Sequence, residues 1–285
     1  MEKFKKNEIV YKEALNSTVT RMDIYSPYIA RKAEPGEFII LRVNEFGERI
    51  PLTVAGYDRE KGLVTIIFQI VGATTFLLNQ LEVGDVICDF VGPLGNKTKT
   101  EGLKKVCVVV GGVGCAIAYP VAEKLHKEGC EVHSVIGFRN KDLIILEKEF
   151  DNVSSKLCLM TDDGSAGEKG LVTNALEKLI LEGNEYDEVI TIGPLVMMKF
   201  VTMLTKKYNI KTIVSMNPIM IDGTGMCGCC RLTVGGKVKF ACVDGPEFDG
   251  FEVDFDEAIS RSRSYTEFEN SAREKTCNLF KKEVK

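Results

Sequence analysis

Residues 106–127 read VCVVVGGVGCAIAYPVAEKLHK, and this stretch decides the fold. Its first five residues are uniformly apolar, which is typical of a strand buried on both faces of a parallel sheet. Gly111, Gly112 and Gly114 follow directly, and a helix is expected at about residues 117–127. A strand, a glycine-rich turn and a helix bring free N–H groups and a helix N-terminus together, where a pyrophosphate can bind. The alternative is an ordinary tight turn between a strand and a helix.

Further strands and helices follow, so this motif opens a longer α/β region. The sequence predicts strands at residues 131–136, 156–161, 188–192 and 211–215, and helices at 141–150, 172–181 and 195–208. Strands that alternate with helices indicate a parallel, doubly wound sheet, here assigned to residues 99–221. The candidate nucleotide-binding residues at the first turn are Gly111, Gly112, Val113 and Gly114.

Residues 1–98 have a different character, because short alternating or β-branched runs recur between turn signals such as Pro35-Gly36. Strands are expected at residues 8–12, 17–24, 38–43, 63–70 and 86–91, and one helix at about 74–80. Several short strands at this spacing predict a small antiparallel β-barrel.

Two segments of this barrel carry groups suited to a flavin. Residues 49–53 read RIPLT, where the arginine can meet a phosphate and the threonine hydroxyl the edge of the ring system. Residues 71–75 read VGATT and start a helix, which supplies N–H groups and hydroxyls for a second phosphate contact. Each segment alone also fits an ordinary strand end or helix start. The candidate flavin-binding residues are Arg49, Pro51, Leu52, Thr53, Phe68, Gln69, Gly72, Thr74 and Thr75.

The strongest chemical signal lies in residues 222–250, which read as loop and short strand and hold a cluster of cysteines. The candidate ligands have the spacing D-x4-C-x2-C-x11-C and are Asp222, Cys227, Cys230 and Cys242. Plant-type [2Fe–2S] loops use C-x4-C-x2-C and a distant fourth cysteine, so the pattern predicts a [2Fe–2S] cluster with an aspartate at its first position. That carboxylate would change the potential of the cluster. A zinc site and a metal-free loop are the alternatives, and Cys229 could replace Asp222.

Composition and charge exclude several classes of protein. The 285 residues are 45% hydrophobic and 27% charged, which is ordinary for a globular protein of about two domains. The 37 basic and 41 acidic residues give a net charge of −4, which argues against a large nucleic-acid surface. The longest run without charge, residues 106–122, is shorter than the ~20 residues of a membrane span, and no signal-peptide core is visible. We therefore expect a soluble, cytoplasmic protein.

The ten cysteines indicate reduced thiols or metal ligands, because no export signal accompanies them. Five of them stand singly in apolar or helical contexts and are expected to be buried, namely Cys88, Cys107, Cys115, Cys130 and Cys158. No serine or cysteine lies in a nucleophile signature with a histidine and an acid, so hydrolase chemistry is not expected. Residues 251–285 predict a helical tail that packs back on the body or contacts a partner subunit.

Taken in order, the barrel with RIPLT, the second flavin loop, the glycine-rich nucleotide fold and the cysteine loop resemble the ferredoxin–NADP reductase superfamily. The chain is similar to two of its groups, the electron-transfer subunits of dihydroorotate dehydrogenase and the small subunits of electron-bifurcating NADH-dependent ferredoxin:NADP oxidoreductases. Further segments that look like these groups are GFR at 137–139, TDDGS at 161–165, MCG at 226–228 and FACVDGPEF at 240–248. The resemblance covers nearly the whole chain.

The first ligand position separates the two groups. The dihydroorotate dehydrogenase subunits have a cysteine where this chain has Asp222, whereas the bifurcating small subunits have an aspartate, so the resemblance favours the latter. Cys229 departs from the family pattern, which usually has a small residue there, and this leaves the ligand set open. The alternatives are a dihydroorotate dehydrogenase subunit, a stand-alone NAD(P)H:ferredoxin reductase, and an electron-transfer module without nucleotide exchange.

The resemblance implies FAD, NAD(H), one [2Fe–2S] cluster and a larger partner subunit with a second FAD and [4Fe–4S] clusters, linked indirectly to ferredoxin and NADP(H). Hydride exchange and electron transfer would then rest on the cofactors, so no catalytic side chain is expected. Bifurcation is expected in the larger subunit. The resemblance adds Arg139, Asp162 and Asp163 to the nucleotide-binding candidates. Arg139 and Lys141 would suit a 2′-phosphate and Asp142 a ribose hydroxyl, so NAD(H) rests on the resemblance.

Overall fold

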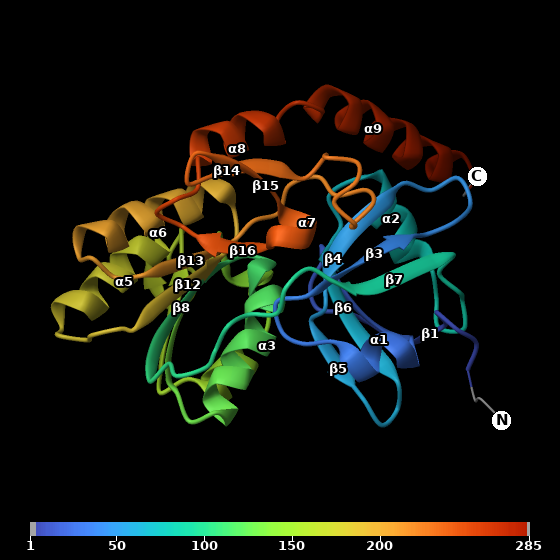
Figure 1. Ribbon diagram of the computed structural model, residues 1–285. Helices are drawn as coiled ribbons and strands as arrows, with labels where there is room; N and C mark the ends of the chain where they lie inside the picture. Colours follow the sequence, from blue (N-terminus) through green and yellow to red (C-terminus); the bar gives the residue numbers. More distant parts are fainter. Residues whose placement is uncertain (1–3, 284–285) are drawn as a thin grey trace.

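The N-terminal strands form two antiparallel sheets that enclose one apolar core (Figure 1). The computed structural model describes the backbone of residues 4–283 and the side chains of residues 4–275. The first sheet has the order β1 (Ile9–Ala14), β2 (Val19–Tyr25), β6 (Leu63–Gln69) and β5 (Gly56–Asp58). The second has the order β4 (Arg49–Thr53), β3 (Phe38–Arg42) and β7 (Asp89–Leu94). The antiparallel region predicted for the N-terminal part is therefore confirmed.

Alternation within the strands explains this core. In β6 every second side chain is buried, and Ile66 and Phe68 share their core with Met22 of β2. The sequence prediction missed helix α1 (Pro27–Lys32) and strand β5, because six and three residues are too few to show a periodic pattern. The predicted helix near residue 74 is α2 (Ala73–Gln80).

A seven-stranded sheet forms the second half of the molecule. Its order is β11 (Glu168–Lys169), β10 (Lys156–Thr161), β9 (Glu131–Phe138), β8 (Lys105–Gly111), β12 (Glu188–Ile192), β13 (Thr212–Ser215) and β16 (Glu247–Asp249). All neighbouring strands are parallel except β13 and β16. Strand order runs outwards from β8 in both directions, which is the predicted doubly wound arrangement.

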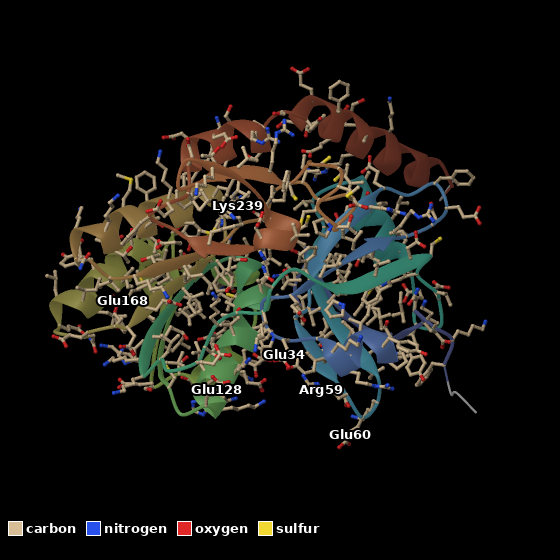
Figure 2. The ribbon with its side chains drawn as sticks, in the orientation of Figure 1. Glu34, Arg59, Glu60, Glu128, Glu168 and Lys239 are labelled. Carbon is tan, nitrogen blue, oxygen red and sulfur yellow. The ribbon has the colours of Figure 1, made fainter. Side chains whose placement is uncertain are left out.

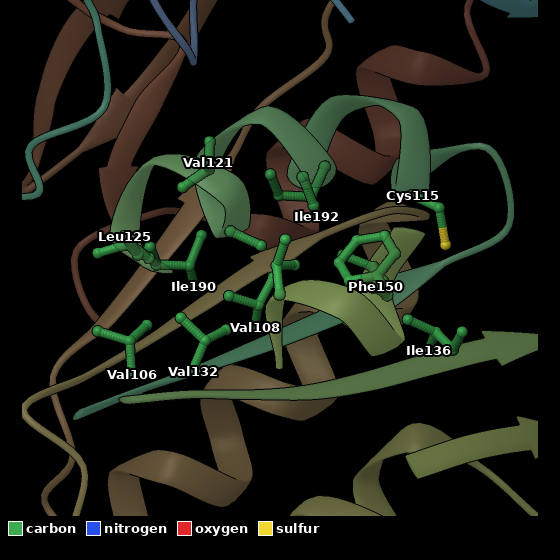
Figure 3. Close-up of a cluster of buried hydrophobic side chains, with 14 of the residues drawn as sticks. Val106, Val108, Cys115, Val121, Leu125, Val132, Ile136, Phe150, Ile190 and Ile192 are labelled. Carbon is green, nitrogen blue, oxygen red and sulfur yellow. The ribbon is translucent and has the colours of Figure 1, made fainter. Parts of the chain in front are cut away.

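Helices cover both faces of this sheet. On one face lie α3 (Gly114–Lys127) and α4 (Glu147–Val153), and on the other α5 (Val172–Leu181) and α6 (Leu195–Lys207). Alternate residues of β8 divide between the two cores, since Val108 packs with α3 and α4 (Figure 3) whereas Val109 packs with α5 and α6. Burial on both faces requires an apolar strand throughout, which is why β8 gave so clear a signal.

The helix predicted for residues 141–150 is wrong. The chain makes a 3-10 turn, η1 (Lys141–Leu143), and α4 begins only at Glu147. Between them Leu146 has a left-handed backbone with φ of 56°, and Ile145 is buried in the core beside α3. The break therefore brings Ile145 into the core, a tertiary contact that helical periodicity cannot show.

The cysteine-rich segment adds a small hairpin and then returns to the parallel sheet. Strands β14 (Arg231–Val234) and β15 (Lys237–Phe240) are joined by two glycines with positive φ, as a two-residue hairpin turn requires. A short helix, α7 (Ala241–Asp244), leads into β16.

The C-terminal helices α8 (Phe255–Ser262) and α9 (Thr266–Glu283) cross the top of Figure 1. Helix α8 contacts α6 and β14, and α9 lies beside α2 of the barrel, so the part of the predicted tail within residues 4–283 packs on the body. Residues 284–285 lie outside the described part. None of the helices in the described chain is both long and apolar enough to cross a membrane.

Polar contacts join the barrel to the α/β region. Glu34 accepts hydrogen bonds from Arg59 of the barrel at 2.7 Å and from Lys124 of α3 at 3.4 Å; Figure 2 labels Glu34 and Arg59. The Thr98 hydroxyl, in the segment that links the two regions, donates to Glu247 of β16 at 2.6 Å. These contacts fix the two walls of the space between the regions.

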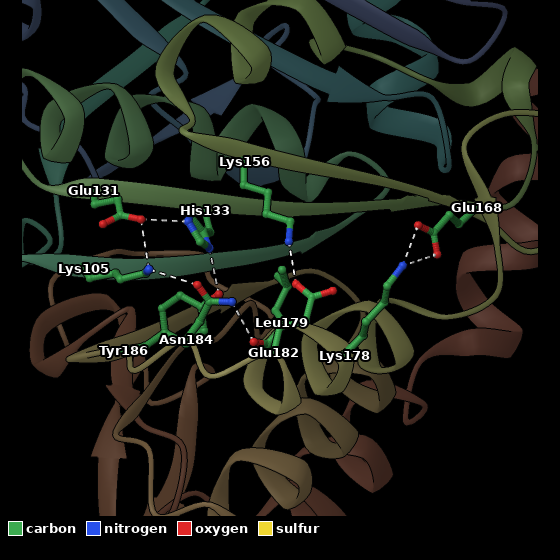
Figure 4. A network of polar contacts seen from close by, with 10 residues as sticks. All are labelled: Lys105, Glu131, His133, Lys156, Glu168, Lys178, Leu179, Glu182, Asn184 and Tyr186. Carbon is green, nitrogen blue, oxygen red and sulfur yellow. Dashed lines mark hydrogen bonds and ion pairs between the residues drawn. The ribbon is translucent and has the colours of Figure 1, made fainter.

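The amino-terminal edge of the parallel sheet holds a paired polar network (Figure 4). His133 Nδ1 lies 2.9 Å from the Tyr186 hydroxyl, and its Nε2 lies 3.0 Å from Glu131 Oε1. Lys105 donates to the same Glu131 carboxylate at 2.9 Å. Burial lowers the pKa of His133, so the imidazole is neutral at pH 7. His133 is thus a structural group of the sheet.

The single cysteines divide by exposure. Cys107, Cys115 and Cys130 are buried as predicted, while Cys158 is half-buried. The prediction for Cys88 is wrong, because this residue is exposed and precedes β7, which begins only at Asp89. Burial raises the pKa of Cys130 to about 11, so this thiol stays protonated and unreactive.

Candidate functional site

A cleft of about 1390 Å³ lies between the barrel and the carboxyl ends of the parallel strands. This volume exceeds the ~300–1,000 Å³ that is usual for one small ligand, so the cleft has room for more than one nucleotide group. Both regions contribute walls, and the carboxyl ends of strands in a doubly wound sheet are where nucleotides bind.

Most of the residues predicted to bind cofactors meet in this cleft. Those that line it are Pro51, Leu52, Thr53, Phe68, Gln69, Thr75, Gly111, Gly112, Val113, Gly114, Arg139 and Asp162. The four that do not line it are Arg49, Gly72, Thr74 and Asp163. The barrel and the glycine-rich turn, far apart in sequence, thus face one space.

Each glycine of the glycine-rich turn is required for a different physical reason. Gly112 has a φ of +57°, in the left-handed region that glycine adopts without strain. A Cβ atom at Gly114 would lie 2.5 Å from the carbonyl oxygen of Ile192, so only glycine lets the start of α3 sit this close to β12. At Gly111 a Cβ would lie 2.6 Å from the sulfur of Met197. The motif therefore keeps the helix N-terminus open to the cleft.

The second flavin segment is organised partly by its own side chains. The Thr75 hydroxyl accepts hydrogen bonds from the amides of Val71 and Gly72, both at 3.0 Å. The buried Thr74 hydroxyl donates to Glu48 at 3.2 Å. Two of the N–H groups expected to be available to a phosphate are therefore already bonded, and Thr75 shapes the start of α2.

Charged groups stand at the ends of β9 and β10. Arg139 and Asp162 line the cleft, whereas Lys141 and Asp142 lie in η1 outside its lining. Asp163 accepts a hydrogen bond from the amide of Ser165 at 2.9 Å. Hydrogen bonding from Ser165 lowers the pKa of Asp163, so this carboxylate is charged at neutral pH. Among the described residues, the cleft lining includes, besides Arg139 and Asp162, one more cation, Lys207, and one more anion, Glu177.

Sequence reasoning missed part of the lining. Gly193 and Pro194 follow β12 directly, and their position at a strand end was the signal that could have identified them. Met197, Met216 and Asn217 also line the cleft, but methionine and asparagine in these contexts carry no chemical pattern.

The cysteine loop lies apart from the cleft lining. The sulfurs of Cys230 and Cys242 are 3.3 Å apart and both residues are buried, whereas Cys227 is exposed. Burial raises the pKa of Cys242 to about 11. Within the described residues, no three histidine, cysteine, aspartate or glutamate side chains are already arranged to hold a metal ion.

The donor set nevertheless fits an iron–sulfur cluster. Thiolates are the ligands of such clusters, and the loop supplies amides that turn towards sulfur. The N–H of Cys229 bonds to the Cys227 sulfur and lowers its pKa, and the Gly225 N–H bonds to the Cys242 sulfur. Gly223, Gly225 and Gly228 all have positive φ, which lets the loop make these turns.

The loop packs directly against the barrel. A Cβ at Gly223 would lie 2.8 Å from Leu94 Cδ1 and 2.9 Å from Ile40 Cδ1. Ile40 lies two residues from Phe38, which lines the cleft, and both belong to the core shared with Cys230. Side chains two residues apart on a strand point to the same face, so Phe38 and Ile40 project from one face of β3, and the cleft lining and the cysteine loop meet along that face.

Comparison with known proteins places the chain. Residues 217–254 match the family model described as the iron–sulfur cluster binding domain of dihydroorotate dehydrogenase B. A Thermotoga maritima protein named as a homologue of the dihydroorotate dehydrogenase B (NAD(+)) electron transfer subunit is 48% identical over 94% of this chain and 95% of its own length. A Clostridium beijerinckii protein named as an uncharacterised protein in the adh 3′ region is 50% identical over 93% of each chain.

A solved structure matches over almost the full length. It comes from a study of flavin-based electron bifurcation by the NADH-dependent reduced ferredoxin–NADP oxidoreductase. The two chains are 45% identical with a TM-score of 0.92, and the match covers 96% of this chain and 99% of the other.

Proposed function

This chain belongs to the family of dihydroorotate dehydrogenase B electron-transfer subunits and their homologues, and on that premise we propose that it is an electron-transferring small subunit of the NADH-dependent reduced ferredoxin:NADP oxidoreductase type. In this role it binds FAD, NAD(H) and one [2Fe–2S] cluster, which together convert a two-electron hydride into single electrons. A larger subunit with a second FAD and [4Fe–4S] clusters receives or supplies those electrons, and ferredoxin and NADP(H) react there.

The observation that carries this proposal is the shared wall of the two sites. Phe38 faces the cleft, and Ile40 on the same strand packs against Gly223 of the cysteine loop. A flavin held by the barrel and a cluster held by the loop would thus lie along the same face of this strand. This closeness suits the passage of single electrons between them.

We assign the residues of each site as follows. The barrel side of the cleft would hold FAD through Arg49, Pro51, Leu52, Thr53, Phe68, Gln69, Gly72, Thr74 and Thr75. The sheet side would hold NAD(H) through Gly111, Gly112, Val113, Gly114, Arg139, Asp162 and Asp163. The cluster ligands would be Asp222, Cys227, Cys230 and Cys242. Four segments divide this work, namely residues 1–98, 99–221, 222–250 and the tail at 251–285.

The side chains act by binding, orienting and excluding water. The open N-terminus of α3 offers N–H groups to a pyrophosphate, and the glycines let it approach closely. The apolar lining, with Phe68 and Leu52, keeps water from the reacting rings. Arg139, which suits a 2′-phosphate, and Asp162, which suits a ribose hydroxyl, both line the cleft, so the assignment of NAD(H) rests on the family.

A dihydroorotate dehydrogenase subunit is the second candidate, because the family model and the names of relatives point to that enzyme. Asp222 at the first ligand position favours the bifurcating type. The candidates separate in reconstitution, since only the second would reduce its flavin when a dihydroorotate-oxidising partner is added. We also propose a cytoplasmic location, because nine free cysteines are described and cluster thiolates need a reducing compartment.

Anaerobic titration of the purified chain tests the proposal. NADH should bleach the flavin absorption and then produce the EPR signal of a reduced [2Fe–2S] cluster, while NADPH should act far more weakly. A colourless protein that binds zinc and ignores both nucleotides would refute the proposal. A chain with flavin and cluster that NADH leaves oxidised would instead support the electron-transfer module without nucleotide exchange.

A further inference from the structure

Helix α6 carries an exposed stripe to which the proposed sites give no role. The α6 stripe consists of Val196, Phe200, Met203 and Lys207, and Phe200 is 55% exposed. Residues at i, i+4, i+7 and i+11 share one side of a helix, so these side chains are aligned. Single exposed apolar side chains are ordinary on a protein surface, but an aligned set is typical of a surface that binds a ligand or a partner.

The α6 stripe is one wall of a groove between α6 and α5, which lie side by side (Figure 1). All four of its residues line the cleft, and the facing wall consists of Thr173, Asn174 and Glu177 of α5. The Tyr208 hydroxyl, directly after α6, donates to Glu177 Oε1 at 3.2 Å and ties the two helices together at the far end. The groove therefore has one mainly apolar wall and one polar wall.

The near end of the groove opens beside the glycine-rich turn. A Cβ atom at Gly111 would lie 2.6 Å from the Met197 sulfur, and a Cβ at Gly193 would lie 2.8 Å from the Met197 methyl carbon. The first turn of α6 therefore packs against the place where a pyrophosphate would bind. From Val196 to Lys207 the helix then rises about 16 Å, which is long enough to accommodate a nucleoside.

The loop after β10 connects the groove with the candidate ribose-binding group. Asp162 follows β10 directly and lines the cleft. The Gly170 amide donates to the Thr161 carbonyl oxygen at 3.1 Å, so the chain returns to the end of β10 just before α5 begins. Leu171, an exposed residue, then lines the cleft at the start of α5. A ribose bound at Asp162 would thus lie next to the wall that α5 contributes to the groove.

We infer that this groove binds the adenine ring of NAD(H) and that adenine stacks on the ring of Phe200. Bases stack readily on aromatic side chains, because every base has a π-face. On the facing wall the Asn174 oxygen accepts from the Leu171 amide at 3.0 Å, which leaves the Asn174 N–H groups to meet the edge of the base.

The position of the groove decides which end of the dinucleotide it takes. Both walls belong to the α/β region, whereas the nicotinamide has to reach a flavin held by the barrel. The adenosine end is therefore the one that the groove receives. The inference rests on the proposed function in requiring that the chain bind NAD(H).

ADP-ribose tests the inference, because it contains the adenosine half of NAD(H) without the nicotinamide. The flavin-loaded chain is used, so that FAD already occupies the barrel side. Calorimetry should show that Phe200→Ala weakens ADP-ribose binding about tenfold, the loss expected for one stacked base. Phe200→Tyr keeps the ring and should bind as the wild type does. Phe268→Ala removes an exposed ring of α9 outside the cleft lining and is the matched control.

Reduced nicotinamide mononucleotide, which lacks the adenosine, gives a second readout. The preference for NADH over this mononucleotide, measured as the ratio of flavin reduction rates at limiting concentration, should fall about tenfold in Phe200→Ala. Unchanged ADP-ribose binding or an unchanged preference would overturn the inference. A wild-type dimer that Phe200→Ala converts to monomers, with ADP-ribose binding intact, would overturn it too and would identify the stripe as a contact between copies of the chain.

Failure of the proposed function has a different signature. A wild-type chain that holds flavin and cluster but binds neither NADH nor ADP-ribose would overturn the proposed nucleotide exchange. In that case the wild type itself fails, whereas failure of the inference about the groove appears only as equal behaviour of Phe200→Ala and a wild type that binds both.

Discussion

The cleft and the cysteine loop are built in different ways, although both lie against the same face of strand β3. The cleft is bounded by the ends of strands and by the start of helix α3, which packs against the backbone of β12. At that contact Gly114 lies so close to the Ile192 carbonyl oxygen that no side chain fits. The loop turns on three left-handed glycines and exposes Met226 and Cys227 at its surface. The nucleotide site is therefore a product of the whole fold, while the cluster site is local and needs its metal to be complete.

The largest expected effect comes from a change that affects the loop alone. Cys242→Ser should abolish cluster binding and electron transfer to an external acceptor, because Cys242 is one of the two sulfurs already in contact. Reduction of the flavin by NADH should continue at the wild-type rate, since the cleft lining does not include this residue. Iron content and stopped-flow absorption measure the two halves separately.

The control for this variant is Cys158→Ser, a half-buried cysteine of β10 outside the loop, which should leave iron content unchanged. A Cys242→Ser chain that keeps its cluster would contradict the ligand assignment. A chain that loses flavin reduction as well would show that the two sites are not built independently.

The contrast between the cleft and the cysteine loop also explains which features could be predicted from the sequence. The strands and most helices of the parallel sheet were visible because β8 is apolar on both faces and the glycines after it mark a nucleotide-binding turn. The ligand spacing in the loop was visible for the opposite reason, since it depends on neighbours in sequence. Both signals are local.

Contacts between distant segments could not be predicted. No pattern shows that Met197 lies against Gly111, or that β16 returns to pair with β13 after the cysteine loop. The helix expected at residues 141–150 failed because Ile145 is drawn into a core that forms only in the folded chain. Arg49 was assigned to a phosphate, and its charge also acts on Asp222 of the loop.

The stability of the contact between the barrel and the α/β region, where Thr98 donates to Glu247, should depend on pH. Burial raises its pKa to about 7, against 4.5 for an ordinary glutamate. Its protonated form is therefore favoured in the folded state, and the stability it provides below pH 4.5 is lost as the pH rises through 7. Glu247→Gln keeps the acceptor for Thr98 and should be up to about 3 kcal/mol more stable than wild type at pH 8.

Urea unfolding at pH 4.5 and at pH 8 measures this difference. The Glu247→Gln and wild-type chains should be similar at the lower pH and diverge at the higher one. Glu60→Gln, at an exposed turn, is the matched control and should follow the wild type at both. Equal stabilities of the Glu247→Gln and wild-type chains at pH 8 would show that the contact between the two regions tolerates a charged Glu247. Other contacts would then hold the cleft and the loop together.

The smallest effect tests the cleft side of the comparison. Gly114→Ala should lower the free energy of unfolding by about 2 kcal/mol, because its Cβ would meet the backbone oxygen of Ile192 at 2.5 Å and push α3 away from β12. It should also weaken NADH binding while leaving iron content unchanged. Gly56→Ala is the control, since its Cβ would meet only Thr65 at an ordinary 3.5 Å. If Gly114→Ala is as stable as Gly56→Ala and binds NADH normally, the start of α3 is not held rigidly, and the contrast between a cleft fixed by the fold and a locally built loop fails.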